Sequence, residues 1–152
     1  MATITPFLWF DGDLAEPIAY YASIFPGASP AELLSADGPI FAATIEVCGQ
    51  QLMLLNGGPM HAGFTEAISL FVSVDTQDEI DDLWHKLTVD GGEPGQCGWL
   101  KDRYGLSWQV VPADWTELLT GPDRARADRA MQAVFGMRKI DVAAVYAAAD
   151  QT

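Results

Sequence analysis

Apolar and polar positions along the chain repeat in two similar blocks. The first block opens with an apolar, aromatic-rich run at residues 4–10, which predicts a strand. Apolar residues at helical spacing follow from Leu14 to Phe25 and stop at Pro26, so this segment predicts a helix. Three short apolar runs then predict three further strands, at residues 32–34, 40–47 and 51–55.

The second block has the same order of elements. Residues 68–74 predict a strand, and Thr76 with Glu79 has the spacing of a capping box at the start of a helix. The apolar stripe of this helix runs through residues 80–87, and Gly91 marks its end. Two short strands complete the block, around residues 99–100 and 106–111.

Matching segments indicate that the two blocks arose by duplication. Residues 7–11 match residues 71–75, and residues 49–55 match residues 105–111. One β-α-β-β-β module cannot bury the inner face of its own sheet, so two cupped sheets are expected to enclose a cleft, within one chain or between two chains. We therefore predict an α+β fold. Its two β-α-β-β-β modules, at about 1–58 and 64–113, form one domain over residues 1–113.

The remaining residues, 114–152, predict a helical tail. A short helix follows Asp114, and Asp123 is placed to cap the next one. Further apolar residues form a last stripe, at Ile140, Val142, Val145 and Tyr146. Because such a tail buries little apolar surface by itself, we expect a homodimer whose interface includes these helices.

Charge is spread unevenly and limits the partners of the chain. The formal net charge is −13; residues 1–100 hold 14 acidic residues and one basic residue, Lys86. Such an acidic body repels phosphate backbones and anionic membranes, so we expect neither nucleic acid nor a membrane as partner. Five of the eight basic residues lie in the tail, either docked on an acidic surface or simply solvated. The chain has no membrane-length apolar run and no signal-peptide pattern, so we expect a cytoplasmic protein.

The cysteines and histidines give little indication of chemistry. Cys48 and Cys97 lack the spacing of a zinc site and are expected to be buried or pocket-lining thiols. His85 lies on the polar side of the second helix and is expected to be solvated. His61 lies in a glycine- and proline-rich loop near the expected mouth of the cleft, within reach of a ligand there.

Five segments together carry a resemblance to a known family: residues 4–12, 20–27, 51–59, 64–72 and 96–112. As a set they resemble the vicinal oxygen chelate superfamily, which contains glyoxalases, bleomycin resistance proteins and extradiol dioxygenases. Within it, the chain is similar to the PhnB-like family labelled 3-demethylubiquinone-9 3-methyltransferase. Residues 137–142 also resemble the helical tail of that family.

The resemblance implies a metal site that the residues of this chain do not supply. Metal-dependent members place His or Glu on the first and fourth strands of each module. The matching positions hold uncharged side chains, at Ile4, Met53, Ile68 or Ser69, and Gln109. We therefore expect no catalytic metal.

A methyl-donor site is not indicated either. Such sites cradle the cofactor on a glycine-rich turn after a parallel strand. Gly57-Gly58 caps an antiparallel strand and Gly91-Gly92 ends a helix, so neither pair has that setting. We expect no bound cofactor, and methyl transfer is implied by the family label alone.

The cleft is still expected to bind a small molecule. Alternation along residues 106–111 places Ser107 and Gln109 on one face of the strand and Trp108 on the other, and by the resemblance the Gln109 face looks into the cleft. The candidate pocket residues are mainly apolar or aromatic, and they suit a planar neutral molecule. They are Trp9, Met53, Ser69, Phe71, Cys97, Trp108 and Gln109. For Trp9, Met53 and Trp108, filling the core is the alternative role.

No catalytic residue is assigned. A nucleophilic Cys97 would need the nearby basic residues to favour its thiolate. Asp102 and Tyr104 are acid–base candidates, although a turn-stabilising salt bridge suits Asp102 better. We therefore predict a metal-independent, dimeric binder of small aromatic or apolar molecules. The alternatives are an enzyme of the same superfamily, acting by methyl transfer or through an adapted metal site, and a structural protein with a filled cleft.

Overall fold

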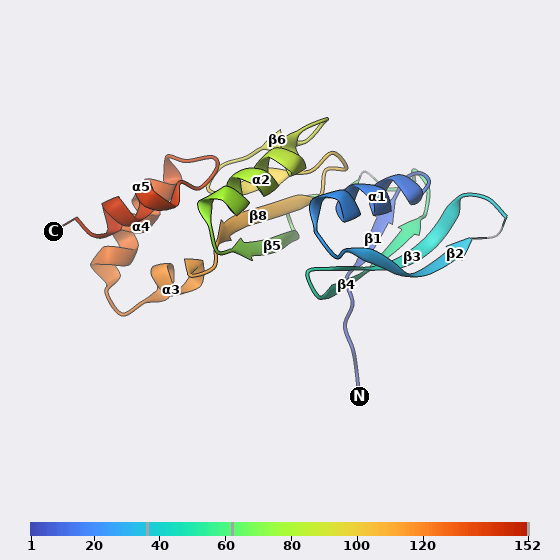
Figure 1. Ribbon diagram of the computed structural model, residues 1–152, viewed down its shortest axis with the longest axis horizontal. Helices are drawn as coiled ribbons and strands as arrows, with labels where there is room; N and C mark the ends of the chain where they lie inside the picture. Colours follow the sequence, from blue (N-terminus) through green and yellow to red (C-terminus); the bar gives the residue numbers. More distant parts are fainter. Residues whose placement is uncertain (36, 62, 152) are drawn as a thin grey trace. The chain divides into compact units, whose positions relative to one another are not determined.

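The chain folds into two compact units, Met1–Gly63 and Phe64–Thr152 (Figure 1). A computed structural model describes residues 1–35, 37–61 and 63–151. In the part it describes, no helix is long and apolar enough to cross a membrane.

The first unit contains one four-stranded sheet and one helix. Its elements are β1 (Phe7–Phe10), α1 (Ala15–Ile24), β2 (Ser29–Ser35), β3 (Ile40–Val47) and β4 (Gln50–Asn56). The strand order is β1-β4-β3-β2, with β1 parallel to β4 and the other neighbours antiparallel. The strand and helix predictions for this block are confirmed, with shifts of one to three residues at most ends.

Helix α1 and one face of the first sheet form the core of that unit. Tyr21 and Ile24 of the helix are buried with Leu8, Ala43 and Leu54 of the strands. Pro17 lies in the first turn of α1, where a missing backbone N–H loses no bond within the helix. Burial of these side chains holds the helix against the sheet, because each fully buried large apolar side chain contributes about 1.5–3 kcal/mol.

The second unit begins with the same module. Its elements are β5 (Ser69–Val74), α2 (Gln77–Thr88), β6 (Glu93–Pro94), β7 (Trp99–Lys101) and β8 (Ser107–Pro112). The order β5-β8-β7-β6, with the first strand parallel to the last, repeats the topology of the first unit. The predicted pair of β-α-β-β-β modules is therefore confirmed.

Local sequence signals determine where α2 begins. The Thr76 side chain accepts a bond from the Glu79 backbone, and the Glu79 carboxylate accepts one from the Thr76 backbone at 2.9 Å. The capping box expected from the sequence is thus formed. The helix ends at Thr88, three residues before Gly91, because Val89 is already extended. Ile80 and Leu87 face the sheet and are fully buried.

The C-terminal helices pack within the second unit. They are α3 (Trp115–Thr120), α4 (Arg124–Phe135) and α5 (Val142–Ala149). Their buried cluster comprises Leu118, Ala130, Val134, Ile140, Val145 and Ala149, and Cys97 of the β6–β7 loop packs against it. The apolar stripes of the tail thus have a partner inside the same chain. The division of the chain lies between residues 63 and 64, and the tail is grouped with the second module.

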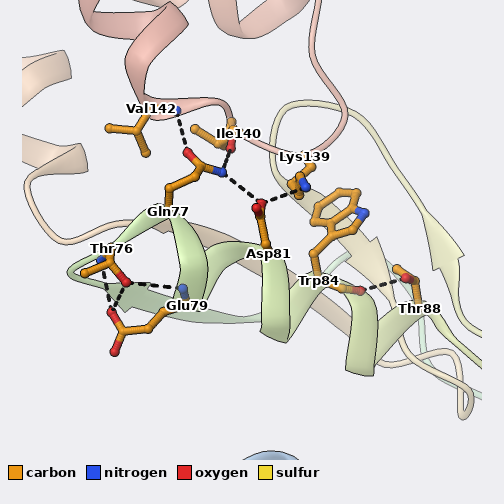
Figure 2. A network of polar contacts seen from close by, with 9 residues as sticks. All are labelled: Thr76, Gln77, Glu79, Asp81, Trp84, Thr88, Lys139, Ile140 and Val142. Carbon is orange, nitrogen blue, oxygen red and sulfur yellow. Dashed lines mark hydrogen bonds and ion pairs between the residues drawn. The ribbon is translucent and has the colours of Figure 1, made fainter.

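Polar contacts attach the segment at the start of α5 to α2, as Figure 2 shows. The Gln77 amide donates to the Ile140 carbonyl at 2.9 Å and accepts from the Val142 backbone at 2.8 Å. It also donates to the Asp81 carboxylate at 3.0 Å, and Lys139 Nζ lies 2.6 Å from the same carboxylate oxygen. These five residues are called the tail clasp below. Lys139, one basic residue of the tail, therefore docks on the acidic helix α2. Docking was one of the two roles expected for the basic residues of the tail.

Candidate functional site

One face of the second sheet is turned away from α2 and carries the candidate site. Alternation along β8 puts Leu100, Trp108 and Val110 of the sheet into the core beneath α2. The opposite face carries Ser69 and Phe71 of β5, Trp99 and Lys101 of β7, and Ser107 and Gln109 of β8. These six residues define what is called the open face of the second sheet.

A hollow of about 420 Å³ lies on the open face. It is lined by Ser107, Trp99 and Lys101 of the strands and by Glu93, Gln96 and Glu66 at its edges, with Pro94, Gly95 and Leu100 between them. Pockets that hold small organic ligands span about 300–1,000 Å³. The hollow is therefore large enough for a molecule of one or two fused rings.

An ion pair and a second carboxylate set the charge of the hollow. Lys101 Nζ lies 2.7 Å from a carboxylate oxygen of Glu66. The hydrogen bond from Lys101 lowers the pKa of Glu66, and the same bond, followed by the charges of Glu66 and Glu93, raises the pKa of Lys101. Lys101 is thus held charged and matched by Glu66, whereas Glu93 adds a negative charge.

Ser107 is a buried residue that lines the hollow. Its side chain is 1% exposed, and within the described ranges no partner lies in hydrogen-bonding distance of its Oγ. A buried hydroxyl without a partner costs free energy, on the order of 1–3 kcal/mol. A ligand in the hollow recovers that cost only where the Ser107 side chain turns its Oγ towards it, because the Oγ itself is buried.

Gln109 and Ser69 pair on the same face. Gln109 Nε2 donates to Ser69 Oγ at 3.0 Å, across the parallel strands β8 and β5. Phe71 is the register partner of Gln109 and is half exposed, and Trp99 is its partner on the other side. Two aromatic side chains thus flank one amide on the open face.

The residues present do not fit the metal that the superfamily implies. The matching positions hold Ile4, Met53, Ile68 or Ser69, and Gln109, and none of these side chains offers the imidazole or carboxylate ligands of such sites. Among the residues that the structure describes, no three His, Cys, Asp or Glu side chains group as metal ligands.

The face of the first sheet that is turned away from α1 is apolar. Phe7 and Met53 are register partners and are 52% and 39% exposed. They line a shallow hollow of about 190 Å³ with Leu34, Ala42 and Thr44. This volume lies below the usual range for small-molecule pockets, and no charged side chain lines it.

Trp9 is held in place beside this face. Its indole Nε1 donates to the Gly58 carbonyl at 2.9 Å, and its ring meets the His61 ring edge-on with centroids 4.6 Å apart. Gly57 has no room for a Cβ, since that atom would overlap the Trp9 indole. Among the described residues, the ring contact found for His61 is the one with Trp9. Its reach towards a ligand stays a prediction.

The structure separates the seven candidate pocket residues into three groups. Ser69, Phe71 and Gln109 lie together on the open face of the second sheet. Trp9 and Met53 belong to the first unit. Trp108 and Cys97 lie elsewhere in the second unit.

Two of the candidates need correction. Trp108 is 3% exposed and donates from Nε1 to Asp102 Oδ2 at 3.0 Å, on the face that packs under α2. It fills the core, which was its alternative role. Cys97 packs against the tail cluster, and its backbone N–H donates to the Met137 carbonyl at 2.8 Å. It is not among the residues that line the hollow.

Asp102 has a structural role in the turn, as its expected turn-stabilising role implies, through hydrogen bonds. Its carboxylate is 1% exposed and accepts from the backbone of Tyr104 and Leu106 as well as from Trp108. These bonds fix the tight turn between β7 and β8. The turn sets the register that puts Trp99 opposite Gln109.

Sequence reasoning missed most of the lining of the hollow: Glu66, Glu93, Gln96, Trp99 and Lys101. It did place Ser107 on the same strand face as Gln109. A usable signal was present for two of the missed residues. Trp99 and Lys101 alternate in β7 just as Ser107 and Gln109 alternate in β8. Pairing the two strands across the Asp102 turn would have brought these four residues to one face.

Comparison with known proteins gives one family and one fold. The model of the 3-demethylubiquinone-9 3-methyltransferase family matches residues 2–111. The search of curated proteins found no match. Among solved structures, the PhnB protein of Bacillus cereus, which bears the same methyltransferase name, is 32% identical. The match covers 74% of this chain and 100% of that one, with a TM-score of 0.64.

Two further structures show the fold alone. Protein PA1353 from Pseudomonas aeruginosa is 24% identical, over 74% of this chain and 98% of that one, with a TM-score of 0.58. The fosfomycin resistance protein FosX from Listeria monocytogenes, solved with Mn(II) and sulfate, is 13% identical. It matches 73% of this chain and 89% of its own, with a TM-score of 0.53.

The duplicated module and its strand order define the class: this is the fold of the vicinal oxygen chelate superfamily. The family match extends through both modules up to residue 111. The chain belongs to the 3-demethylubiquinone-9 3-methyltransferase family, with the PhnB protein among its relatives. The resemblance stated from the sequence is thereby confirmed.

Proposed function

We propose that this chain binds small aromatic or apolar molecules without a metal, and that the hollow on the open face of the second sheet is the site. The observation that carries the proposal is the hollow itself, of about 420 Å³, which is lined by Trp99 together with charged and polar residues of the same unit. An aromatic wall with a few placed polar groups is the usual composition of a small-molecule site.

The polar groups support binding more directly than they support catalysis. Glu66 and Lys101 are engaged with each other, and Gln109 with Ser69. A general acid or base needs a group that is free to exchange a proton with the substrate near neutral pH. Stacking on Trp99 and attraction to the Glu93 carboxylate are interactions that this arrangement offers a ligand.

We also infer that the protein is a homodimer. The supporting observation is the first sheet, whose outward face exposes large apolar side chains, at Phe7, Leu34 and Met53. Contiguous apolar surface of this kind on a water-soluble chain is typical of an interaction site. We propose that a second copy of the chain covers this face. The proposed interface is therefore the first sheet and not the tail helices, which the sequence alone suggested.

The binding proposal is tested by a thermal-shift screen with a panel of aromatic metabolites. The expected result is a rise in melting temperature with one or more flat ligands, lost in Trp99→Leu. Trp84→Leu is the matched control, since Trp84 lies on α2 at the other side of the sheet. The proposal fails if no ligand stabilises the wild type, or if both variants respond as the wild type does.

The family name favours one alternative, methyl transfer. Calorimetry with S-adenosylmethionine at millimolar concentration decides this branch. Heat of binding, together with transfer of the methyl group from S-adenosylmethionine to an aromatic acceptor, would establish that the protein is a methyltransferase. Absence of heat eliminates this donor and leaves the binding proposal standing.

A further inference from the structure

We propose that the hollow of the second unit selects aromatic cations, in which a positively charged nitrogen belongs to or adjoins a flat ring system. This inference rests on the proposed binding function and names the class of ligand. It differs from the planar neutral molecule that the sequence suggests, because the charged lining of the hollow emerges only from the fold.

The balance of charge in the hollow is the first support. Three charged side chains line it, Glu66, Glu93 and Lys101, and the Lys101 ammonium is already paired with Glu66 at 2.7 Å. In the described part of the chain, no cationic side chain lies within ion-pairing distance of Glu93. A cation entering the hollow therefore meets one unmatched carboxylate, and an anion meets no unmatched base.

The aromatic wall is the second support. A cation held over the face of an indole is attracted by the negative charge density of the ring, and tryptophan is the strongest of the aromatic side chains in this respect. Trp99 lies on the strand next to Glu93, in the antiparallel pair β7 and β6. Ring and carboxylate thus line the same hollow, so one ligand nitrogen can meet both.

Ser107 is the third support and is independent of the carboxylates. Its buried Oγ is without a partner among the residues described, and it lines the same hollow. Once the Ser107 side chain turns towards the hollow, its hydroxyl oxygen can accept a hydrogen bond from an N–H or O–H group of the ligand. Stacking, charge and one acceptor together describe an aromatic amine or a protonated ring nitrogen.

The charge of the whole chain acts in the same direction. The net charge of −13 produces a negative potential around the protein, which raises the local concentration of cations and lowers that of anions. This long-range effect is weakened by salt, whereas the contact with Glu93 is weakened less.

The test compares three probes of similar size and different charge. They are 1-methylquinolinium, quinoline and 1-naphthoate, titrated into the full chain by calorimetry at pH 7.5 and low salt. We expect 1-methylquinolinium to bind at least about 5-fold more tightly than quinoline, with 1-naphthoate the weakest.

Two charge variants locate the effect. Glu93→Gln is expected to weaken 1-methylquinolinium about 3- to 10-fold and to leave quinoline unchanged, whereas Lys101→Met is expected to tighten it by a similar factor. Asp82→Asn is the matched control, since this exposed carboxylate pairs with Lys86 on α2, away from the hollow. Circular dichroism of each variant establishes that it is folded.

The outcomes separate the two proposals. Binding of quinoline or 1-naphthoate at least as tight as that of the cation overturns the charge preference and leaves small-molecule binding intact. Equal effects of Glu93→Gln and Asp82→Asn also overturn it, because the preference would then be a property of net charge alone. If none of the three probes binds, both proposals fail.

Discussion

Ser107 holds a hydroxyl that folding removes from water without giving it a partner among the described residues. We therefore expect Ser107→Ala to raise the free energy of unfolding of the ligand-free protein by about 1 kcal/mol. The same change is expected to weaken aromatic ligands. Urea titration with and without ligand measures both effects.

Ser69→Ala is the control for this pair of effects. Ser69 accepts from Gln109 at 3.0 Å, so its removal is expected to lower stability by about 1 kcal/mol. A loss of stability in Ser107→Ala as large as that in Ser69→Ala would show that the hydroxyl is satisfied after all, and would remove one support of the site.

Asp102 is the residue on which the β7–β8 turn depends most. Its buried carboxylate accepts three bonds, at 2.9, 3.1 and 3.0 Å, and an alanine would leave all three donors without it. We expect Asp102→Ala to cost about 3 kcal/mol or more. Asp90→Asn, which removes the charge from an exposed contact of 3.6 Å with Arg103 and keeps a residue type that tolerates the φ of 56° at this position, is expected to cost less than about 1 kcal/mol. Equal costs for the two variants would contradict this role.

At the scale of elements, the tail clasp joins α2 to the loop before α5 (Figure 2). Gln77→Leu keeps the size of the side chain and removes its bonds to Ile140, Val142 and Asp81. We expect a loss of about 2–3 kcal/mol of unfolding free energy and faster amide hydrogen exchange in α5. His85→Ala, an exposed change on the same helix, is expected to alter neither. Unchanged exchange in α5 after Gln77→Leu would show that apolar burial alone holds the tail.

Acid should loosen the same clasp. The hydrogen bond from Lys139, and then that from Gln77, lowers the pKa of Asp81. A carboxyl whose pKa is lowered by folding stabilises the fold above its ordinary pKa of about 3.9, and this contribution is lost as the pH falls through the lowered value. The wild type is therefore expected to lose stability below about pH 4 more steeply than Asp81→Asn. Parallel curves of stability against pH for the two proteins would contradict this.

The elements differ in how far their sequence determines them. Helix α2 is predictable because its cap, Thr76 with Glu79, and its apolar stripe lie within the helix and its first turn. Strand β6 has two residues, one of them Pro94, and exists only through its pairing with β7. The position of Trp99 was missed for a related reason. Trp99 lies beside Gln109 because of the strand register across the Asp102 turn, and that register cannot be read from either strand alone. Alternation separates the two faces of a strand. It does not tell which face packs under the helix, and so it does not tell Trp108 in the core from Trp99 on the open face.

At the scale of the whole molecule, apolar surface and charge oppose each other. The first unit contains six acidic and no basic residues, yet its sheet exposes Phe7 and Met53. If a second copy covers that face, the dimer brings together two chains of charge −13, and salt should strengthen it by screening their repulsion. We expect light scattering to give about twice the chain mass of 16.4 kDa, with tighter association at 0.5 M than at 0.05 M salt.

Met53→Lys tests whether the first sheet is the surface involved. A lysine there is expected to yield monomers, whereas Phe135→Lys, at an exposed apolar position of α4, is expected to leave the dimer intact. If Phe135→Lys yields monomers and Met53→Lys does not, the interface lies at the tail helices, as the sequence alone suggested.

The central claim is that the hollow beside Trp99 receives the ligand, and the indole N–H signals of the five tryptophans report on it most directly. In two-dimensional NMR spectra of the full chain, titration with 1-methylquinolinium should move the signal assigned by Trp99→Leu. The buried indole of Trp108, bonded to Asp102 behind the sheet, should move little. If the Trp99 signal stays fixed while binding saturates, the ligand lies elsewhere and the account of this site is contradicted.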